Sequence, residues 1–522
     1  MSKKRPNVLL VLTDQHRPDH LGFGGNPIVQ TPTLDALAAR SMRFTSAFVA
    51  NPLCQPNRCS MLTMRYPSVH GTRHNGIALD WDANTFVRRL RADGYRTGLV
   101  GKGHFQNFEL WPDIAREQFD FSLDEQASLT GLPGVDRWDA YESIQRHVDE
   151  DVVFPDDYYG FEHVEIASNH GDEVTGHYVG WLREKGSDWH DVAGLANAEW
   201  VSSDWEQVRK PSMPVELYST TFVAERSAAW IEDHADDDEP WFLQCSFPDP
   251  HHPFTPPGDY AHMYSPADMV LPATFDDPHS HSVPHIQRMI ATRGQLNPTP
   301  ALQAPNETQL RQAMAHEYGA ITMIDDAIAN VLASLERSGQ ADDTIVIFTS
   351  DHGDMFGDHG LILKMFVHYD GVLRVPFTIS GPGIQAGSTD SMVNTLDLGE
   401  TILDLCGVDS YFGSQGKSLT PILDNPSVEL RNALLIEEDQ IRDGLGAGVQ
   451  PRMRTLLTKT ARLTRYQNVD EHCLFDLGND PDELENRWND PSSITLRREM
   501  GEALTEQMIA AADPSYRPNY IA

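Results

Sequence analysis

The sequence contains no long hydrophobic run. Its 522 residues include no stretch of 18 or more apolar residues, which excludes a membrane-spanning helix. The apolar segment nearest the N-terminus, residues 8–12, is too short for the core of a signal peptide, and no cleavage site of small residues follows it. We therefore expect a soluble, cytoplasmic protein that has no membrane partner.

Basic residues are also few. The chain has 40 Lys and Arg against 77 Asp and Glu, which gives a formal charge of −37. Such a field repels nucleic acids, anionic membranes and sulfated polymers at long range. Nucleic acid is therefore excluded as a partner, and a small substrate is favoured over a polyanionic one. A basic pocket inside an acidic surface can still bind a single anionic group.

Cysteine is rare as well. The five cysteines, at positions 54, 59, 245, 406 and 473, are odd in number and widely scattered, which argues against a disulfide framework. One of them opens the stretch Cys54-Gln-Pro56-Asn-Arg58. Pro56 fits the first turn of a helix, because its missing N–H needs no partner there and its φ is already helical.

This helix start predicts an oxyanion site. Cys54 would lie at the positive end of the helix, near unpaired backbone N–H groups, and Arg58 would lie one turn further along the same face. A small nucleophilic side chain, free N–H donors and a guanidinium together suit a tetrahedral oxyanion. The alternative is a buried structural cysteine near a helix start. Partners elsewhere in the chain are needed to decide between the two.

The fold class follows from strands and helices that alternate up to about residue 420. Continuous apolar runs at 8–12, 241–247 and 344–350 are typical of parallel strands covered on both faces. Helical spacing predicts a helix that Thr31-Pro32 opens, with Leu34 and Met42 on its apolar face, and another over residues 307–338. We expect an α/β domain, residues 1–425, with a mainly parallel central sheet and helices on both faces.

Two regions depart from this alternation. Residues 110–220 are aromatic, acidic and weakly periodic, and we expect inserts that form the substrate-side wall and a subunit contact. Residues 426–522 carry short predicted strands at 433–436 and 453–458 and a helix from about residue 494, which indicates a small α+β C-terminal subdomain. The long inserts and the extended C-terminal tail favour a homo-oligomer, either a dimer or a tetramer.

Carboxylates follow two of the predicted strands, as Asp14-Gln15 and as Asp351-His352. Ligands of open α/β sheets bind beyond the carboxyl ends of the strands, so these side chains are placed to meet. Oxygen ligands with one imidazole suit a hard or borderline divalent cation, Mn²⁺ or Ca²⁺.

Basic side chains follow other predicted elements. Lys102 and His104 come after the strand at 99–100 and, at a strand spacing of two, point the same way. His251 follows the strand at 241–247, and Lys364 lies in a loop before the strand at 375–380. These groups could bind the oxygens of an oxyanion or move protons. The histidines at 279, 281 and 285 are irregularly spaced among Pro, Asp and Ser, so we expect a solvated loop there and no metal site.

In order and spacing, these elements resemble the type I (formylglycine-dependent) sulfatases of the alkaline phosphatase superfamily along nearly the whole chain. The matching stretches are Asn7-Val-Leu-Leu-Val-Leu-Thr-Asp14, Cys54-x-Pro-x-Arg58, Gly101-Lys-x-His104, Pro250-His-x-Pro253, Ser350-Asp-His-Gly353, Lys364, Arg374-Val-Pro and Leu474-Phe-Asp-Leu-x-x-Asp-Pro. The resemblance implies an alkaline phosphatase-like fold and hydrolysis of sulfate monoesters. It also implies that a formylglycine-generating enzyme oxidises Cys54 to Cα-formylglycine.

The resemblance further implies a role for each matching residue. The implied metal ligands are Asp14, Gln15, Asp351, His352 and the oxidised residue 54. Arg58 and Lys102 would orient and charge-stabilise the formylglycine hydrate, one hydroxyl of which attacks sulfur. His104 would take the hydrate proton when the sulfated intermediate collapses. His251 and Lys364 would contact the sulfate and protonate the leaving oxygen.

Two positions differ from the common family pattern. Many sulfatases have Asp-Asp after the first strand and Asp-Asn at the later site, where this chain has Asp14-Gln15 and Asp351-His352. These variants resemble the phosphonate monoester hydrolase and choline sulfatase branches, and they favour Mn²⁺ over Ca²⁺. Lys102 and His104 are kept as in sulfatases, and Asn75 is implied to line the substrate pocket.

Three functions stay open at this point. The first is hydrolysis of a small aryl or alkyl sulfate monoester. The second is hydrolysis of a phosphonate monoester or phosphate diester at the same site, which could also serve both kinds of substrate. The third is a non-catalytic, metal-stabilised binding protein, which requires residue 54 to remain a thiol.

Overall fold

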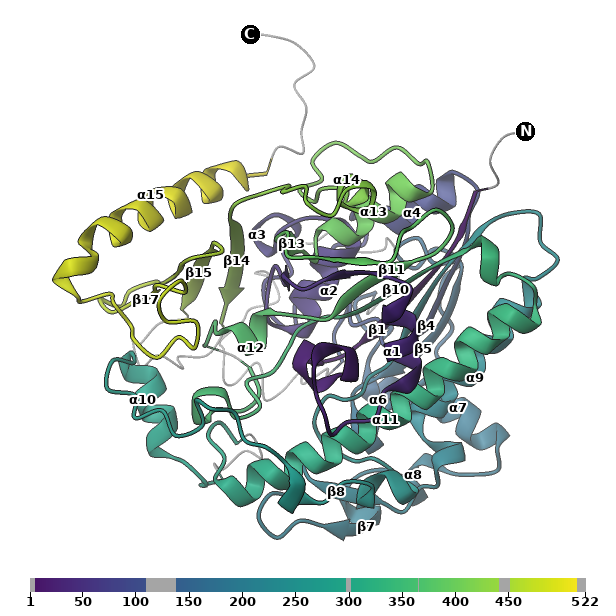
Figure 1. Cartoon of the computed structure of the whole chain (residues 1–522). Helices are drawn as coiled ribbons and strands as arrows, with labels where there is room; N and C mark the ends of the chain where they lie inside the picture. The colour runs from purple at the N-terminus through teal and green to yellow at the C-terminus, as the bar shows by residue number, and fades with distance from the viewer. Residues whose placement is uncertain (1–4, 109–137, 297–301, 365, 441–450, 514–522) are drawn as a thin grey trace.

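The computed structural model describes residues 5–108, 138–296, 302–364, 366–440 and 451–513, and a sheet of nine strands forms its centre (Figure 1). In spatial order the strands are β12 (Gly387–Thr389), β2 (Met42–Phe44), β11 (Phe377–Ser380), β10 (Thr344–Ser350), β1 (Asn7–Thr13), β9 (Trp241–Ser246), β4 (Arg96–Gly101), β5 (His163–Ser168) and β6 (Thr175–Gly176). The strands from β10 to β5 run parallel to one another, whereas β11 and β6 are antiparallel to their neighbours. The prediction of a mainly parallel central sheet is confirmed.

Both faces of this sheet are buried, as the continuous apolar runs predicted. Val8, Leu10 and Leu12 of β1 pack into one hydrophobic cluster, whereas Leu9 and Val11 pack into another on the opposite face. Successive side chains of a strand point to opposite faces, so a strand that is covered on both sides needs apolar residues at every position. All seven residues of β1 are buried.

Helices cover both faces (Figure 1). The cluster that contains Leu10 includes residues of α2 (Cys54–Thr63), α4 (Phe86–Ala92) and α13 (Asp397–Leu405). The cluster that contains Leu9 includes residues of α1 (Pro32–Ala39), α7 (His177–Glu184), α9 (Ser219–Asp233) and α11 (Glu307–Arg337). A capping box of Asn306 and Gln309 starts α11, which confirms the predicted long helix.

Shorter elements lie in the connections. The short helices are α3 (Pro67–His70), α6 (Ile144–Asp149), α8 (Trp189–Val192), α10 (Pro284–Ala291), α12 (Asp370–Leu373) and α14 (Thr420–Asp424). Two strand pairs, β3 (Ala47–Phe48) with β13 (Val393–Asn394) and β7 (Ala198–Val201) with β8 (Arg209–Pro211), lie outside the main sheet. None of the helices in the described residues is long and apolar enough to cross a membrane.

The C-terminal region forms a second sheet, which is antiparallel. Its four strands, in spatial order, are β14 (Leu434–Asp439), β15 (Arg452–Leu457), β16 (Arg462–Tyr466) and β17 (Cys473–Phe475). Met500 and Leu504 of α15 (Ile494–Ala510) pack against this sheet, at the end of the molecule away from α9 in Figure 1. The predicted short strands and terminal helix are confirmed, and the domain boundary at 425/426 stays a prediction.

Two predictions about local structure are wrong. Met42 belongs to β2 and not to the preceding helix, because α1 ends at Ala39 and the Ser41 hydroxyl bonds the Leu37 carbonyl oxygen (2.7 Å) as the chain leaves the helix. Of the segment 110–220, residues up to 137 lie outside the described part of the chain, and the remainder does not consist of inserts alone, because β5 lies within it and is part of the central sheet.

The predicted solvated histidine loop is wrong for two of its three histidines, whereas His281 is exposed as predicted. His279 and His285 are buried, and each donates from Nε2 to a backbone carbonyl oxygen, that of His359 (2.8 Å) and that of Phe366 (3.0 Å) respectively. Their ring nitrogens are thus engaged by the backbone of a neighbouring loop, which explains how they can be buried without a metal.

Candidate active site

Polar side chains gather where the central strands end. The parallel register of β1 and β10 ends at a paired position, so Asp14 and Asp351 follow at the same edge of the sheet. Lys102 follows β4 at this edge, and its backbone N–H donates to the carbonyl oxygen of Ser246, the last residue of β9 (2.8 Å). The carboxyl ends of four neighbouring strands therefore meet, as in other open α/β sheets that bind ligands.

The helix α2 brings the predicted nucleophile to this edge. It begins at Cys54, which is 1% exposed, and Pro56 lies in its first turn, as the sequence predicted. The backbone N–H of Gln55, however, is not free, because it donates to Asn75 Oδ1 (3.2 Å). Asn75 thus caps the helix from a separate loop, and fewer free N–H groups face the site than we predicted.

Arg58, one turn along α2, ties the strand ends together. Its guanidinium donates to Asp351 Oδ2 (2.6 Å), to Asp14 Oδ2 (3.2 Å) and to the carbonyl oxygen of Lys102 (2.9 Å). Each of these side chains is almost wholly buried. Buried carboxylates are tolerated when a guanidinium pairs with them in this way, so Arg58 holds both strand-end carboxylates in place.

Lys364 brings the other predicted residues together. Its ammonium lies 2.8 Å from Gln15 Oε1, 2.9 Å from His251 Nε2, 2.9 Å from His352 Nε2 and 3.4 Å from Cys54 Sγ. A lysine ammonium has three N–H donors and no acceptor, so these atoms face it as acceptors and at most three of them can be bonded at once. Residues from five separate stretches of the sequence thus converge on one point.

The buried groups around Asp14 have the donor chemistry for a divalent cation. Ligand atoms of Asp14, Cys54, Asp351 and His352 all lie within 4.8 Å of one another. Asp14 Oδ1 is buried and has no hydrogen-bond partner among the described residues, which is costly unless a cation supplies one. His352 Nδ1 faces the carbonyl oxygen of Gly353 (2.8 Å), which turns Nε2 toward the two carboxylates.

Protons compete with a cation at His352. Burial lowers the pKa of this imidazole, but Asp351 and Cys54 offset the effect and raise it above its usual value. A metal binds the neutral form of imidazole, so a cation at this site must displace the proton.

The site also stabilises negative charge on residue 54. Burial alone would raise the pKa of the Cys54 thiol, but Lys364 and Lys102, with hydrogen bonds from His104 and His170, hold it well below its usual range. The other four cysteines are buried too, and burial raises their pKa values. Cys54 is therefore electrostatically distinct, which does not fit an inert structural cysteine.

His104 reaches the site by a turn that the strand spacing did not predict. β4 ends at Gly101, where φ is 103° and the Ser246 carbonyl leaves no room for a side chain. His104 itself has a φ of 58°, and its backbone N–H donates to the carboxylate of Glu142. Burial lowers the pKa of His104 to about 4, so the ring is neutral at pH 7 and can accept a proton.

Two histidines at the site were missed in the sequence. His170, which follows β5, stacks on His251 with ring centroids 3.6 Å apart, and His251 stacks on His252 at 4.1 Å. His170 also contributes to a second group of possible metal-ligand atoms, but the ammonium of Lys102 already contacts its Nε2. A histidine directly after a sheet strand is the signal that would have found it, had β5 been recognised.

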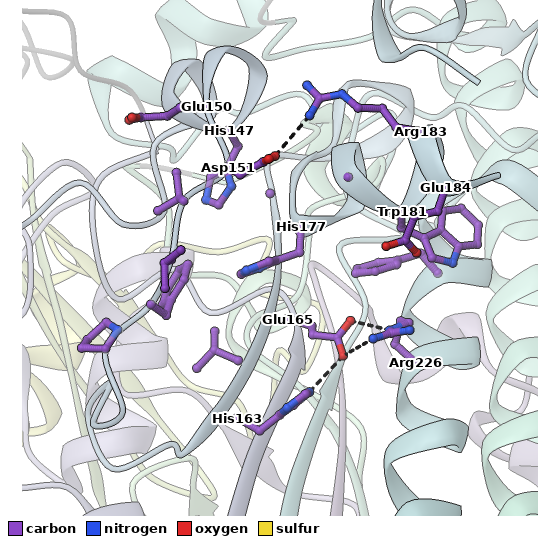
Figure 2. A pocket seen from close by; sticks show the side chains of 18 of the residues that line it. His147, Glu150, Asp151, His163, Glu165, His177, Trp181, Arg183, Glu184 and Arg226 are labelled. Atoms are coloured by element: carbon purple, nitrogen blue, oxygen red, sulfur yellow. Dashed lines mark hydrogen bonds and ion pairs between the residues drawn. The ribbon is translucent and has the colours of Figure 1, made fainter. Parts of the chain in front are cut away.

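A cavity of about 690 Å³ lies apart from these residues and is lined by residues of β5, α7 and α9 (Figure 2). Several of its charged side chains pair with one another: Glu165 with Arg226 (2.9 Å) and His163 (2.9 Å), and Asp151 with Arg183 (3.2 Å). Within the described part of the chain, no group of metal-ligand atoms lies in this cavity. The reactive groups therefore concentrate at Cys54.

Comparison with known proteins gives the family. The model described as Sulfatase matches residues 6–408, a range that contains every site residue named above. The chain belongs to the sulfatase family. A second model, described as N-sulphoglucosamine sulphohydrolase, C-terminal, matches residues 357–510 of this sulfatase.

Relatives and solved structures agree with this assignment. An arylsulfatase from Clostridium perfringens is 28% identical over 494 residues, which cover 93% of this chain and 90% of that protein. A choline-sulfatase from Rhizobium meliloti is 26% identical over 511 residues, which cover 96% of this chain and 87% of that protein. The phosphonate monoester hydrolase of Silicibacter pomeroyi shares the fold, with a TM-score of 0.77, 23% identity and coverage of 98% and 96%.

These findings confirm the resemblance at the level of family, fold and reaction type. The protein is a sulfuric ester hydrolase with an alkaline phosphatase-like fold. A non-catalytic binding protein, the third function left open by the sequence, does not fit this family.

Proposed function

We propose that this sulfatase hydrolyses a small aryl or alkyl sulfate monoester with a nucleophile derived from Cys54 by oxidation to formylglycine. The observation that carries the proposal is the positive charge around residue 54: Lys364 Nζ lies 3.4 Å from Cys54 Sγ, and Lys364 and Lys102 together lower the pKa of the buried thiol. A pocket of this kind binds one anionic group. The formal charge of −37 on the whole chain disfavours a highly sulfated polymer.

A divalent cation would be held by Asp14, Gln15, Asp351 and His352 together with residue 54. When bound, it would act as a Lewis acid that polarises the nucleophile and one sulfate oxygen. The two carboxylates match its charge, and Arg58 keeps both of them in position. An imidazole among oxygen ligands favours Mn²⁺ over Ca²⁺.

An aldehyde hydrate at residue 54 would supply one hydroxyl that attacks sulfur and a second hydroxyl whose deprotonation expels sulfate. Lys102, which contacts Asp14, would stabilise the negative charge that develops on the attacking oxygen. His104 is neutral and hydrogen-bonds residue 54, so it would accept the proton of the second hydroxyl. His251 and Lys364, whose nitrogens are 2.9 Å apart, would bind the sulfate and protonate the leaving oxygen.

Hydrolysis of a phosphonate monoester or phosphate diester is the second candidate function. Gln15 and His352 favour it, because they replace the Asp and Asn of the common sulfatase pattern, and the fold is shared with a phosphonate monoester hydrolase. Lys102 and His104 favour the sulfate, because they occupy the positions expected of a sulfatase.

The two candidates are separated by kcat/KM values for an aryl sulfate and for the matching aryl phosphonate monoester. The protein is produced together with a formylglycine-generating enzyme, its proposed maturation partner, and the Cys54→Ala variant serves as the control. We expect the sulfate to react faster and the variant to be inactive with both substrates. Undiminished sulfate hydrolysis by Cys54→Ala would sink the proposal, and equal kcat/KM values would mean a promiscuous site.

A homo-oligomer stays part of the proposal. Light scattering on the full chain tests it, with a dimer or tetramer expected and a monomer as the contradicting result.

A further inference from the structure

Gln15 is the predicted metal ligand whose chemistry depends on its orientation. An amide carries an oxygen that can bind a cation and a nitrogen that cannot, since both hydrogens of the NH₂ group make it a donor. The two orientations differ by a rotation of the terminal torsion, which has no strong preference of its own. Neighbouring side chains must therefore decide which atom faces the metal ligands.

Asp354 favours one orientation by its contact with the amide nitrogen. Gln15 Nε2 donates to Asp354 Oδ2 (2.6 Å) and lies 3.3 Å from His252 Nδ1. An ionised carboxylate can only accept, so the atom that faces it is the NH₂ group. Gln15 Oε1 is then turned to the opposite side, where it accepts from the ammonium of Lys364 (2.8 Å) beside the other predicted ligands.

Asp354 is itself held from two sides. It is fully buried, and its Oδ1 accepts the backbone N–H groups of Phe356 (2.7 Å) and Leu363 (2.9 Å). Arg17 donates to its carbonyl oxygen (2.8 Å). With one carboxylate oxygen committed to the loop, the other oxygen is fixed toward Gln15 and cannot turn away.

The backbone of Gln15 is fixed as well. Its φ of 61° is unusual for a residue other than glycine, and its N–H donates to Asp351 Oδ1 (3.1 Å). The Cα–Cβ bond therefore leaves the backbone in a set direction, and the contacts of the amide group hold the far end of the side chain.

We propose that Asp354 is a positioning residue that holds the Gln15 amide with its oxygen toward the cation site. It acts through Gln15 and is outside the set of predicted ligands. This inference rests on the proposed metal-binding function and extends it to the choice between oxygen and nitrogen. It also gives a reason for Gln at position 15, since a glutamate there would put a second carboxylate 2.6 Å from Asp354.

The Asp354→Asn variant tests the proposal. Its amide oxygen has to stay with the N–H groups of Phe356 and Leu363, so its NH₂ group faces the NH₂ group of Gln15. Two donors repel, so the orientation with the Gln15 oxygen toward the cation site loses its support from Asp354, and the rotated amide, whose nitrogen faces the site, becomes populated. We expect the Mn²⁺ affinity of the metal-free full chain, followed by electron paramagnetic resonance titration, to fall by about 10- to 100-fold.

Rescue separates positioning from a merely structural role. In the double variant Gln15→Glu with Asp354→Asn, one oxygen of the new carboxylate accepts from the new amide and the other faces the cation, so Mn²⁺ affinity should return. The matched control is Asp358→Asn, in the same loop, since Asp358 pairs with Arg17 (2.8 Å) and not with Gln15. Its Mn²⁺ affinity should stay within about twofold of the parent.

Two results would overturn the proposal. One is an Asp354→Asn variant that binds Mn²⁺ as well as the parent does. The other is a double variant that folds, as judged by circular dichroism, but does not regain affinity. The metal titration does not use the formylglycine, so loss and rescue would support the positioning role even if sulfate hydrolysis failed. A parent chain that bound no Mn²⁺ would overturn both this proposal and the proposed metal site.

Discussion

Replacement of Lys364 by methionine should raise the pKa of Cys54 in the metal-free protein that has not been converted to formylglycine. The ammonium lies 3.4 Å from Cys54 Sγ. At an effective dielectric constant of about 20, a charge pair at this distance interacts by about 5 kcal/mol. Lys364 is half-buried, so solvent screening reduces this interaction, and we expect the pKa of Cys54 to rise once the ammonium is removed.

The sign follows from the charge that is removed. Lys364 and Lys102 hold the pKa of Cys54 well below its usual range, so they favour the thiolate in the parent. Without the Lys364 ammonium the thiolate is less stable, and the thiol should remain protonated to higher pH. The measurement is a pH titration of the ultraviolet absorbance of the thiolate, with the signal of Cys54→Ala subtracted.

Two comparisons make this experiment decisive. The other four cysteines have raised pKa values, so they should stay silent at neutral pH. Lys459→Met is the matched control, because Lys459 is exposed and pairs with Glu429 and Asp390 far from Cys54 in the chain. The reasoning is refuted if Lys364→Met titrates at the same pH as the parent.

Three further predictions follow from the site. Asn75→Ala removes the α2 cap, worth about 1 kcal/mol, and should lower the melting temperature and raise KM. Asn75→Asp should keep the cap and the melting temperature but raise KM more, because it adds a carboxylate beside the sulfate. Equal KM values for the two variants would contradict this prediction. Burial raises the pKa of Asp249 to about 7, so the folded state holds a proton that the unfolded state has lost, and stability falls between about pH 4 and 7 by up to about 4 kcal/mol. Asp249→Asn should therefore melt at a higher temperature than the parent at pH 8 but not at pH 4, and identical melting profiles would refute the assignment. Mn²⁺ affinity measured by calorimetry should rise with pH. Asp351 and Cys54 favour a proton on His352, and the cation must displace this proton to bind. A pH-independent affinity would argue against His352 as a ligand.

The sequence predicted best where local pattern and burial agree. β1 and β10 are apolar at every position and end in polar residues, so both the strands and the carboxylates at Asp14 and Asp351 could be read directly. β5 was missed because its first half is only half-buried and carries His163 and Glu165, which hides the strand pattern. His170 was missed for the same reason, because the sequence could not place it after a strand that was not predicted.

Contacts made by the folded chain could not be read from the sequence. Asn75 was expected near the pocket, but its contact with the N–H of Gln55 joins two stretches that only the fold brings together. The pairing of Asp354 with Gln15 crosses from one strand end to the loop after another. Neither contact has a local sequence pattern, because each depends on the relative placement of separate elements.

The central claim is that a formylglycine at position 54 carries out the hydrolysis. Trypsin releases residues 44–58 as one peptide, in which Cys54 is the sole cysteine. The measurement is the mass of this peptide, together with sulfatase activity, in protein made with and without a formylglycine-generating enzyme. We predict a peptide lighter by the difference between a thiol and an aldehyde, and activity that rises in proportion to the converted fraction. Full activity in protein whose Cys54 is unmodified would contradict the account.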